Sequence, residues 1–431
     1  MTWLVADVGG TNARFALIAG PGAAPERIGT LRTRDYPGLA EAAAAYLERH
    51  APDVRLDAAC LAVAGPVANG RFRLTNADWP PGTADQVRAH LGLPYVEILN
   101  DFEGLALALP HLTEDDVVRI GPPPSSTPQA TSASGPLATT PVATAPLATG
   151  SETPDTSASG QRNPGTSAAT PAGTGTGTWT SDTRGLHAPA PGSSASDASV
   201  SGAGTSTRDA SGFGGRGFGT LAVLGPGTGL GVGGLLPVPG AGPGGGVRWM
   251  PIASEGGQVD VPAATEREID VMRLLRAERG AATAEYLLSG DGLVRLHRYL
   301  SMIHGIAPEP RTAAEVCARR DDPVCAEAVE MFCALLGSLA GNVALTLGAR
   351  GGVFLGGGIL PRIADVLRAS AFRDRFEAKP PVEEYLRAIP TALIVHPSPA
   401  LTGAAAHLAQ NLSANTVGGA DTVEPPAMEH A

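Results

Sequence analysis

Two segments rich in glycine and threonine are the parts of this chain best suited to binding phosphate. Each lies close behind a run of apolar residues, and their residues are Gly9, Gly10, Thr11 and Asn12 in the first and Gly227, Thr228 and Gly229 in the second. Glycine lets the backbone approach an anion and point its N–H groups at it, and threonine adds a hydroxyl donor. Two such turns in separate halves of the chain predict a nucleotide held between them.

Other kinds of nucleotide site do not fit the sequence. Lys379 is the only lysine, so there is no Gly-Lys-Ser/Thr sequence and no Walker-type site. Gly229, Gly231 and Gly234 match the dinucleotide pattern, but that pattern must open a helix, and residues 235–240 are rich in proline and do not look helical. The remaining pattern of strand, Gly-Thr turn and strand resembles the phosphate hairpin of actin-like and hexokinase-like ATPases.

Eight short motifs follow one another along the chain, at residues 7–14, 61–66, 74–79, 99–102, 224–231, 255–260, 288–290 and 351–358. Their order and spacing resemble the bacterial glucokinases of the proteobacterial type, across nearly the whole chain. The resemblance implies an α/β protein with two lobes, of the actin-like or hexokinase-like (ribonuclease H-like) fold, and an active-site cleft between the lobes. It implies ATP-dependent phosphorylation of glucose to glucose 6-phosphate, a step of glycolysis, with ATP and Mg²⁺ required.

Composition limits the classes of partner. The net charge of −11 gives no basic surface for nucleic acid. The N-terminus has neither a basic region nor an apolar signal segment, and we expect no membrane span and a cytoplasmic location. The four cysteines, Cys60, Cys317, Cys325 and Cys333, form no Cys-x-x-Cys pair, so we expect buried reduced thiols rather than metal ligands.

One composition break divides the chain. Residues 122–217 are almost wholly Ser, Thr, Ala, Gly and Pro, which cannot bury a core and predict a disordered insert. We therefore predict a small α/β lobe at 1–117, completed by about 398–413, an insert at 118–217 and a large α/β lobe at 218–397. Residues 414–431 read as a disordered tail.

Strands and helices alternate on both sides of the insert. The expected strands are 4–8, 13–18, 59–64, 96–99, 221–224, 230–235 and 353–355. The expected helices are 38–49, 84–91, 266–279, 284–288, 293–303, 324–347 and 363–370.

Asp101 is the candidate general base. It follows a strand and precedes an apolar helical stretch, so its carboxylate should emerge at the carboxyl edge of the sheet, where ligands of α/β proteins bind. Taken by position alone, an aspartate here is more often a helix N-cap than a catalytic residue. The resemblance of residues 99–102 to the glucokinase motif implies the catalytic role. It also implies that Asp7 acts through Mg²⁺ and its water shell, and that both Gly-Thr turns contact the phosphates. Arg14 either stabilises phosphate charge or makes a surface pair.

Sugar recognition requires acceptors and donors in fixed directions. The resemblance implies that Glu255 and Glu285 bind glucose from one side and that Asn100 and Asp101 meet the far side of the ring. Asn76 is a further candidate. These acids, taken alone, would also suit helix caps or surface positions.

Gln258 departs from the family pattern, which has histidine at this place after Glu-Gly-Gly. Glutamine donates and accepts hydrogen bonds but does not titrate near neutrality, so affinity for the sugar and hexose preference are the properties most open to change.

The adenine is expected against residues 351–358, at Gly356 and Gly357. Alternatives are a kinase for another hexose, motivated by Gln258, a sugar-binding regulator without catalysis, and an assembling actin-like ATPase. The resemblance also implies a homodimer.

Overall fold

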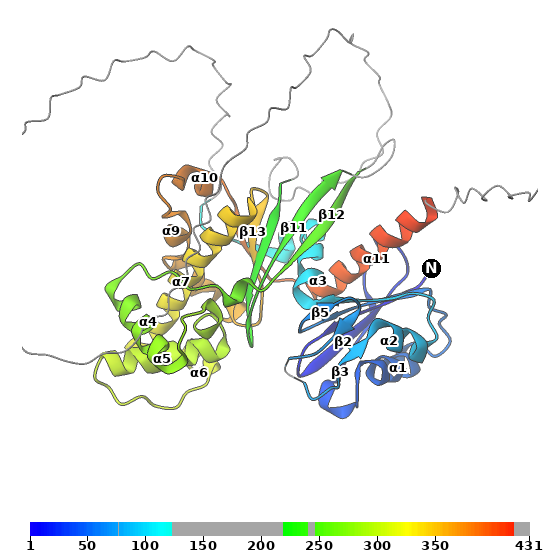
Figure 1. The fold of residues 1–431 in the computed structure, drawn as a ribbon, viewed down its shortest axis with the longest axis horizontal. Helices are drawn as coiled ribbons and strands as arrows, with labels where there is room; N and C mark the ends of the chain where they lie inside the picture. The colour runs from blue at the N-terminus through cyan, green and yellow to red at the C-terminus, as the bar shows by residue number, and fades with distance from the viewer. Residues whose placement is uncertain (76, 123–218, 240–245, 418–431) are drawn as a thin grey trace, which may run out of the picture. The chain divides into compact units, whose positions relative to one another are not determined.

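The computed structural model describes residues 1–75, 77–122, 219–239 and 246–417. Asn76, most of the predicted insert and the residues after 417 lie outside this part of the chain. Within it, two large sheets form the centres of two lobes (Figure 1).

The first lobe is built on a five-stranded sheet in the order β3-β2-β1-β4-β8. Its strands are β1 (Trp3–Val8), β2 (Asn12–Ile18), β3 (Glu26–Arg32), β4 (Ala58–Val63) and β8 (Val96–Asn100). β1, β2 and β3 form an antiparallel meander, whereas β4 runs parallel to β1 and β8 parallel to β4. The carboxyl ends of β1, β4 and β8 therefore meet at one edge of the sheet.

Helices α1 (Leu39–His50) and α2 (Ala84–Leu91) pack beside each other in this lobe. A small antiparallel sheet follows β4 and consists of β5 (Val67–Ala68), β6 (Arg71–Phe72) and β7 (Gly82–Thr83). Strand β4 is buried at every position, because apolar groups cover both faces of the sheet.

The second lobe repeats the topology of the first. Its sheet has the order β12-β11-β10-β13-β14-β9, with β10 (Leu221–Pro226), β11 (Leu230–Pro239), β12 (Val247–Ser254), β13 (Gly352–Leu355), β14 (Thr391–Ile394) and β9 (Val117–Ile120). Again three antiparallel strands, β10 to β12, are followed by two strands parallel to the first. The two Gly-Thr turns occupy equivalent places, the β1–β2 and the β10–β11 hairpins.

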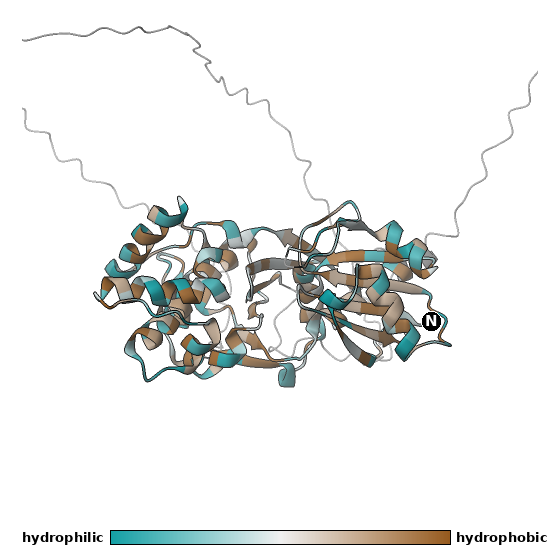
Figure 2. Cartoon of the chain, turned by 90° about the horizontal axis from the view of Figure 1, so that it is seen from below, coloured by the Kyte–Doolittle hydropathy of each residue, from teal (hydrophilic) through white to brown (hydrophobic). Residues whose placement is uncertain are grey.

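The helices of the second lobe are α4 (Glu266–Arg279), α5 (Gly290–Ile303), α6 (Ala313–Ala318), α7 (Pro323–Leu347), α8 (Ala364–Ala369), α9 (Phe372–Glu377) and α10 (Glu383–Arg387). By length and hydropathy α7 could span a bilayer, but 83% of its most apolar window is buried in the lobe, so it is a core helix. Figure 2 shows apolar brown along the strands and mixed colours along the helices.

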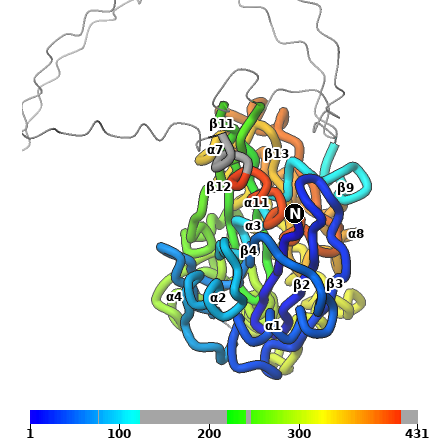
Figure 3. Tube along the Cα trace, turned by 90° about the vertical axis from the view of Figure 1, so that its right-hand side faces the viewer, coloured from blue at the N-terminus to red at the C-terminus, as the bar shows by residue number. Residues whose placement is uncertain are grey.

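Two helices connect the lobes. Helix α3 (Asp101–Ala108) follows β8 and contacts β10, β11 and β12, while α11 (Pro399–Val417) packs on β1 and β4. The two helices also lie side by side (Figure 3). Their closest approach is at Gly104 and Gly403, where a Cβ on Gly403 would overlap the carbonyl oxygen of Gly104.

Most of the expected elements are confirmed. The predicted α2 and α4 have the observed bounds, and the seven predicted strands all exist. The predicted helix at 284–288 is wrong, because only a 3-10 turn, Ala284–Tyr286, forms there. The four cysteines are buried and unpaired, as expected.

Two predicted boundaries are also wrong. Residues 118–120 belong to β9, which pairs with β14, so they are part of the large sheet and not of the insert. Helix α11 continues to Val417, beyond the predicted end of the folded chain at residue 413. The elements that were not predicted, because their residues lack a clear period of apolar positions, are strands β3, β5, β6, β7, β9, β12 and β14 and helices α6 and α9 to α11.

Candidate active site

Asp101 is the first residue of α3, directly after the end of β8. The preceding residue, Asn100, caps the helix: its Oδ1 accepts the Phe102 N–H at 2.8 Å, while Glu103 accepts the Asn100 N–H at 2.9 Å. The cap is therefore supplied by Asn100 rather than by Asp101, which answers the alternative role that sequence position left open for this aspartate.

The Asp101 carboxyl has an environment suited to accepting a proton. Burial and the nearby charge of Asp7 raise its pKa to about 7, against the opposing effect of the Phe102 and Asp101 peptide N–H groups. A base with a pKa near the working pH combines a populated deprotonated form with a useful proton affinity. The sequence predicted the position of Asp101, and the fold supplies its basicity.

Asp7 lies near the end of β1, two strands away from Asp101 in the sheet. Burial raises the pKa of its carboxyl and Arg14, its partner across the β1–β2 hairpin, lowers it. Arg14 also donates to the Pro397 carbonyl at 2.9 Å and to the Ser398 hydroxyl at 2.8 Å, just before α11. Arg14 thus connects the hairpin to α11, which agrees with the pairing interpretation.

The first Gly-Thr turn closes the β1–β2 hairpin. The Gly9 N–H donates to the Asn12 carbonyl at 2.9 Å, and Thr33 donates from its hydroxyl to the Gly10 carbonyl at 2.7 Å and from its N–H to the Thr11 carbonyl at 3.0 Å. Thr33 therefore holds the outer carbonyl groups of the turn in place.

A cavity of about 470 Å³ lies at this turn, lined by Gly10, Thr11, Asn12, Arg32, Thr33 and Arg34. The two arginines were missed by sequence reasoning. The sequence feature that could have indicated them is a pair of arginines two residues apart at the end of a strand. Guanidinium groups at this position favour a phosphate ligand.

The second Gly-Thr turn joins β10 to β11 and packs against the start of α5. The Gly227 N–H donates to the Gly229 carbonyl at 2.8 Å, and the Gly290 N–H donates to the Gly227 carbonyl at 2.8 Å. A Cβ at Gly229 would lie 2.6 Å from Oε2 of Glu285, so this glycine is required for the close approach of that carboxylate. Thr228 lies between these two glycines.

Glu285 connects the second Gly-Thr turn to Gln258. Its Oε2 accepts the Leu230 N–H at 2.9 Å, and its Oε1 accepts the Gln258 side-chain N–H at 2.9 Å. Glu285 and Gln258, which the sequence placed separately, are therefore neighbours at the start of β11.

Glu255 precedes Gln258 in a 3-10 turn, Gly256–Gln258, in which its carbonyl accepts the Gln258 N–H at 2.9 Å. The Glu255 side chain is exposed and has no hydrogen-bond partner within the described residues. It is available to a ligand. Asn100, by contrast, uses its side chain for the helix cap and for donation to the Gly65 carbonyl at 2.8 Å. Asn76 lies outside the described residues.

The glycines at the end of β13 lie against the second phosphate turn. The Gly356 N–H donates to the Leu224 carbonyl at 2.7 Å. Gly357 has φ of 86°, and a Cβ there would collide with the Pro226 carbonyl. A base stacked on these glycines would be next to phosphates held at Gly227 to Gly229.

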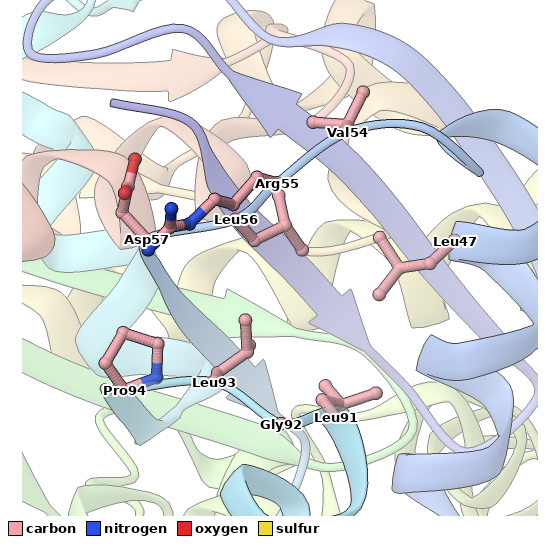
Figure 4. Close-up of a pocket in the computed structure, with 9 residues that line it drawn as sticks. All are labelled: Leu47, Val54, Arg55, Leu56, Asp57, Leu91, Gly92, Leu93 and Pro94. Atoms are coloured by element: carbon pink, nitrogen blue, oxygen red, sulfur yellow. The ribbon is translucent and has the colours of Figure 1, made fainter.

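Two other features lie away from these residues. Figure 4 shows the residues that line a second cavity, which has a volume of about 470 Å³. They are Leu47, residues 54–57 with Arg55 and Asp57, and residues 91–94. Because these residues precede the starts of β4 and β8, the cavity lies at the opposite edge of the sheet from Asp101.

The other feature is a cluster of three candidate metal ligands, His297, Asp322 and Cys325. Asp322 already accepts the Val324 N–H at 2.9 Å and an Arg311 N–H at 2.8 Å. The adjacent guanidinium opposes a cation there, which favours a structural role for the cluster.

Comparison with known proteins gives a match to one protein family, and this match covers both lobes. The sequence model of the family described as Glucokinase matches residues 4–138 and 208–411. A glucokinase of Paramagnetospirillum magneticum is 35% identical over 405 residues, which cover 93% of this chain and 96% of that protein.

Solved structures agree with this result. The crystal structure of a glucokinase from an Antarctic psychrotroph has a TM-score of 0.65 and 27% identity, covering 95% of this chain and 99% of that one. A ROK family glucokinase from Streptomyces griseus, solved with glucose and AMPPNP, has a TM-score of 0.50 and 16% identity, covering 95% and 100%. The latter similarity shows a shared fold.

Proposed function

Because the chain belongs to the glucokinase family, and its activity is the ATP-dependent phosphorylation of glucose, we propose that Asp101 is the general base of this reaction. The observation that carries the proposal is the partly buried position of Asp101 within the electrostatic influence of Asp7, and both raise the pKa of its carboxyl to about 7. In the proposed reaction the 6-hydroxyl oxygen of glucose forms a bond to the γ-phosphorus of ATP, and the Asp101 carboxylate accepts the proton of that hydroxyl group. The bond between that phosphorus and the β,γ-bridging oxygen breaks, ADP leaves, and the proton on Asp101 later passes to solvent.

The phosphates are assigned to the two Gly-Thr turns, with peptide N–H groups at Gly10 to Asn12 on one side and Gly227 to Gly229 on the other. The support for this is their equivalent place in two sheets of the same topology. Arg32 and Arg34 are among the residues that line the cavity at the first turn, and their side chains would add positive charge there. Adenine is assigned to Gly356 and Gly357, next to the second turn.

The residues around Asp7 fit a magnesium ion. The ionised forms of two partly buried carboxyl groups, of which Asp7 raises the pKa of Asp101, would each be stabilised by a divalent cation. Asp7 would hold Mg²⁺ through its water shell, and bound Mg²⁺ would neutralise charge on the β- and γ-phosphates.

Glucose is assigned to Glu255 and Glu285, with Gln258 as the donor that orients Glu285. Asn100 is assigned a smaller role than Asp101 in binding the sugar, since its amide already caps α3 and bonds to Gly65. Asn76 keeps its predicted role in binding the sugar. The cytoplasmic location and the homodimer remain predictions, and light scattering on the purified protein tests the dimer.

An ADP-release assay with Mg-ATP tests the base. It compares glucose, mannose, fructose, N-acetylglucosamine and no sugar for the wild type, Asp101→Asn and the exposed control Asp85→Asn. We expect glucose-dependent turnover in the wild type and in the control, and a loss of about 10²–10⁴-fold in kcat for Asp101→Asn. Retention of more than a tenth of kcat in Asp101→Asn would exclude Asp101 as the base. Sugar binding without turnover in the wild type would favour the regulator alternative.

A further inference from the structure

We propose that Phe102 is a positioning residue that fixes the Asp101 carboxylate relative to the second phosphate turn; this rests on the proposed role of Asp101 as general base. Phe102 is the residue after Asp101, and its ring lies on two glycines of the β10–β11 hairpin. A Cβ at Gly225 would lie 2.6 Å from the ring atom Cζ, and a Cβ at Gly231 would overlap the ring.

The ring is the reason that Gly231 must be glycine. Neither Gly225 nor Gly231 has a positive φ, so any residue could adopt their backbone conformations. Gly233, two residues further along β11, has different neighbours. A Cβ there would lie 3.6 Å from the Phe102 carbonyl oxygen and 3.6 Å from Val223 Cγ1. That is an ordinary van der Waals contact, so the tight approach is specific to the ring.

The backbone of Phe102 connects this contact to Asp101. The Phe102 N–H donates to Oδ1 of Asp101 at 3.1 Å and to Oδ1 of Asn100 at 2.8 Å. One residue therefore holds the carboxylate of the base through its N–H and contacts the phosphate hairpin through its ring. A shift of the ring on Gly231 would move the N–H that orients Asp101.

The opposite side of α3 is also fixed, because Gly104 of α3 and Gly403 of α11 are in backbone contact. Helix α3 is thus held by α11 on one side and by the hairpin on the other, and it begins at Asp101. In-line transfer requires the base, the accepting oxygen and the γ-phosphate to be aligned, and an error of about 1 Å lowers the rate by about 10²-fold. The contact between Phe102 and Gly231 sets one part of that alignment.

A double-mutant cycle tests the proposal. The variants are Phe102→Ala, Gly231→Ala and the double variant, with Gly233→Ala as the matched control on the same strand, each measured for kcat, both KM values and thermal stability. We expect Gly231→Ala to lower kcat by about 10- to 100-fold with KM values within about threefold, and Gly233→Ala to stay within about twofold of the wild type. In the Phe102→Ala background the cavity admits the new methyl group, so Gly231→Ala should then change kcat by less than about twofold.

The pH profile separates positioning from packing. Phe102→Ala removes a large apolar side chain next to Asp101, so we expect the Asp101 carboxyl to become better solvated, its pKa to fall and the acid limb of kcat to move to lower pH. An unchanged limb, or an equal loss of kcat from Gly231→Ala in both backgrounds, would overturn the proposal. Failure of the general-base proposal has a different signature, because Asp101→Asn would then keep its turnover whatever the cycle shows.

Discussion

The side-chain amide of Gln258 donates a hydrogen bond of 2.9 Å to Oε1 of Glu285, whose other oxygen accepts the Leu230 N–H. Residue 258 therefore fixes the direction in which the Glu285 carboxylate points, and it would act on the proposed sugar site through Glu285. An amide makes this hydrogen bond at any pH near neutrality, whereas an imidazole would make it according to its protonation state.

Removal of this donor should weaken sugar binding more than catalysis. For Gln258→Leu we expect KM for glucose to rise about 3- to 10-fold with a smaller change in kcat, since one hydrogen bond to a charged group is lost at an exposed site. Steady-state kinetics over several hexoses measure this. Gln258→His, which keeps a donor, should lose less and should make KM depend on pH; equal losses for both variants would contradict the assignment.

The Asp101 carboxyl should titrate near neutrality. Its pKa of about 7 depends on burial first and on the Asp7 charge second. The base is active when deprotonated, so kcat/KM for glucose should rise with pH through this range. Carboxyl ¹³C NMR of the protein without ligands measures the pKa directly, and Asp101→Asn identifies the signal. Asp7→Asn should lower this pKa, since it removes a negative charge; no shift would show that the two groups do not interact.

The same pKa predicts an effect of pH on stability. A carboxyl whose pKa is raised by folding binds protons more tightly in the folded protein, so its effect on the free energy of unfolding becomes less favourable as pH rises from about 4 to about 7. Asp101→Asn should therefore raise Tm by at least about 2 °C at pH 8, and the gain should shrink near pH 4. Calorimetry at both values measures it, and a gain independent of pH would point to another cause.

The crossing of α3 and α11 should not tolerate a side chain. Alanine usually stabilises a helix relative to glycine, by about 1 kcal/mol. Gly403→Ala should instead lower the free energy of unfolding by about 1–3 kcal/mol, because its Cβ would overlap the Gly104 carbonyl oxygen. Denaturant unfolding measures this change. Thr402→Ala, at the neighbouring position of α11, is the control, and a stabilised Gly403→Ala variant would disprove the close contact.

Deletion of residues 123–218 should leave activity within about twofold of the wild type. Ile120 at the end of β9 pairs with Thr391, and Leu221 at the start of β10 pairs with Gly352, so both ends lie at the same edge of the sheet. Strands β13 and β14 lie between β10 and β9, so the two ends are three inter-strand spacings apart, or about 14 Å at roughly 4.8 Å per spacing. A linker of about eight Gly and Ser residues spans it. A tenfold loss of kcat with unchanged Tm would assign these residues a role in catalysis.

The sequence by itself determined the parts of this protein that depend on neighbouring residues. The Gly-Thr turns, the strands before them, helices α2 and α4 and the order of the motifs follow from local pattern and spacing, and they were sufficient to indicate the family. Local pattern placed Asp101 where a strand ends and a helix begins, and the resemblance of residues 99–102 to the family motif made it the candidate base.

Only the tertiary structure decided what depends on residues far apart in the chain. The pKa of Asp101 requires burial and the charge of Asp7 on another strand. The hydrogen bonds of Glu285 to Gln258 and Leu230 require Glu285 in a 3-10 turn, where local pattern had predicted a helix. The contact of Phe102 with Gly231 has no local signal either, since one residue follows β8 and the other lies on β11 of the second sheet. Desolvation, charge interaction and steric fit all act through space, and a single sequence does not encode those distances as a local pattern.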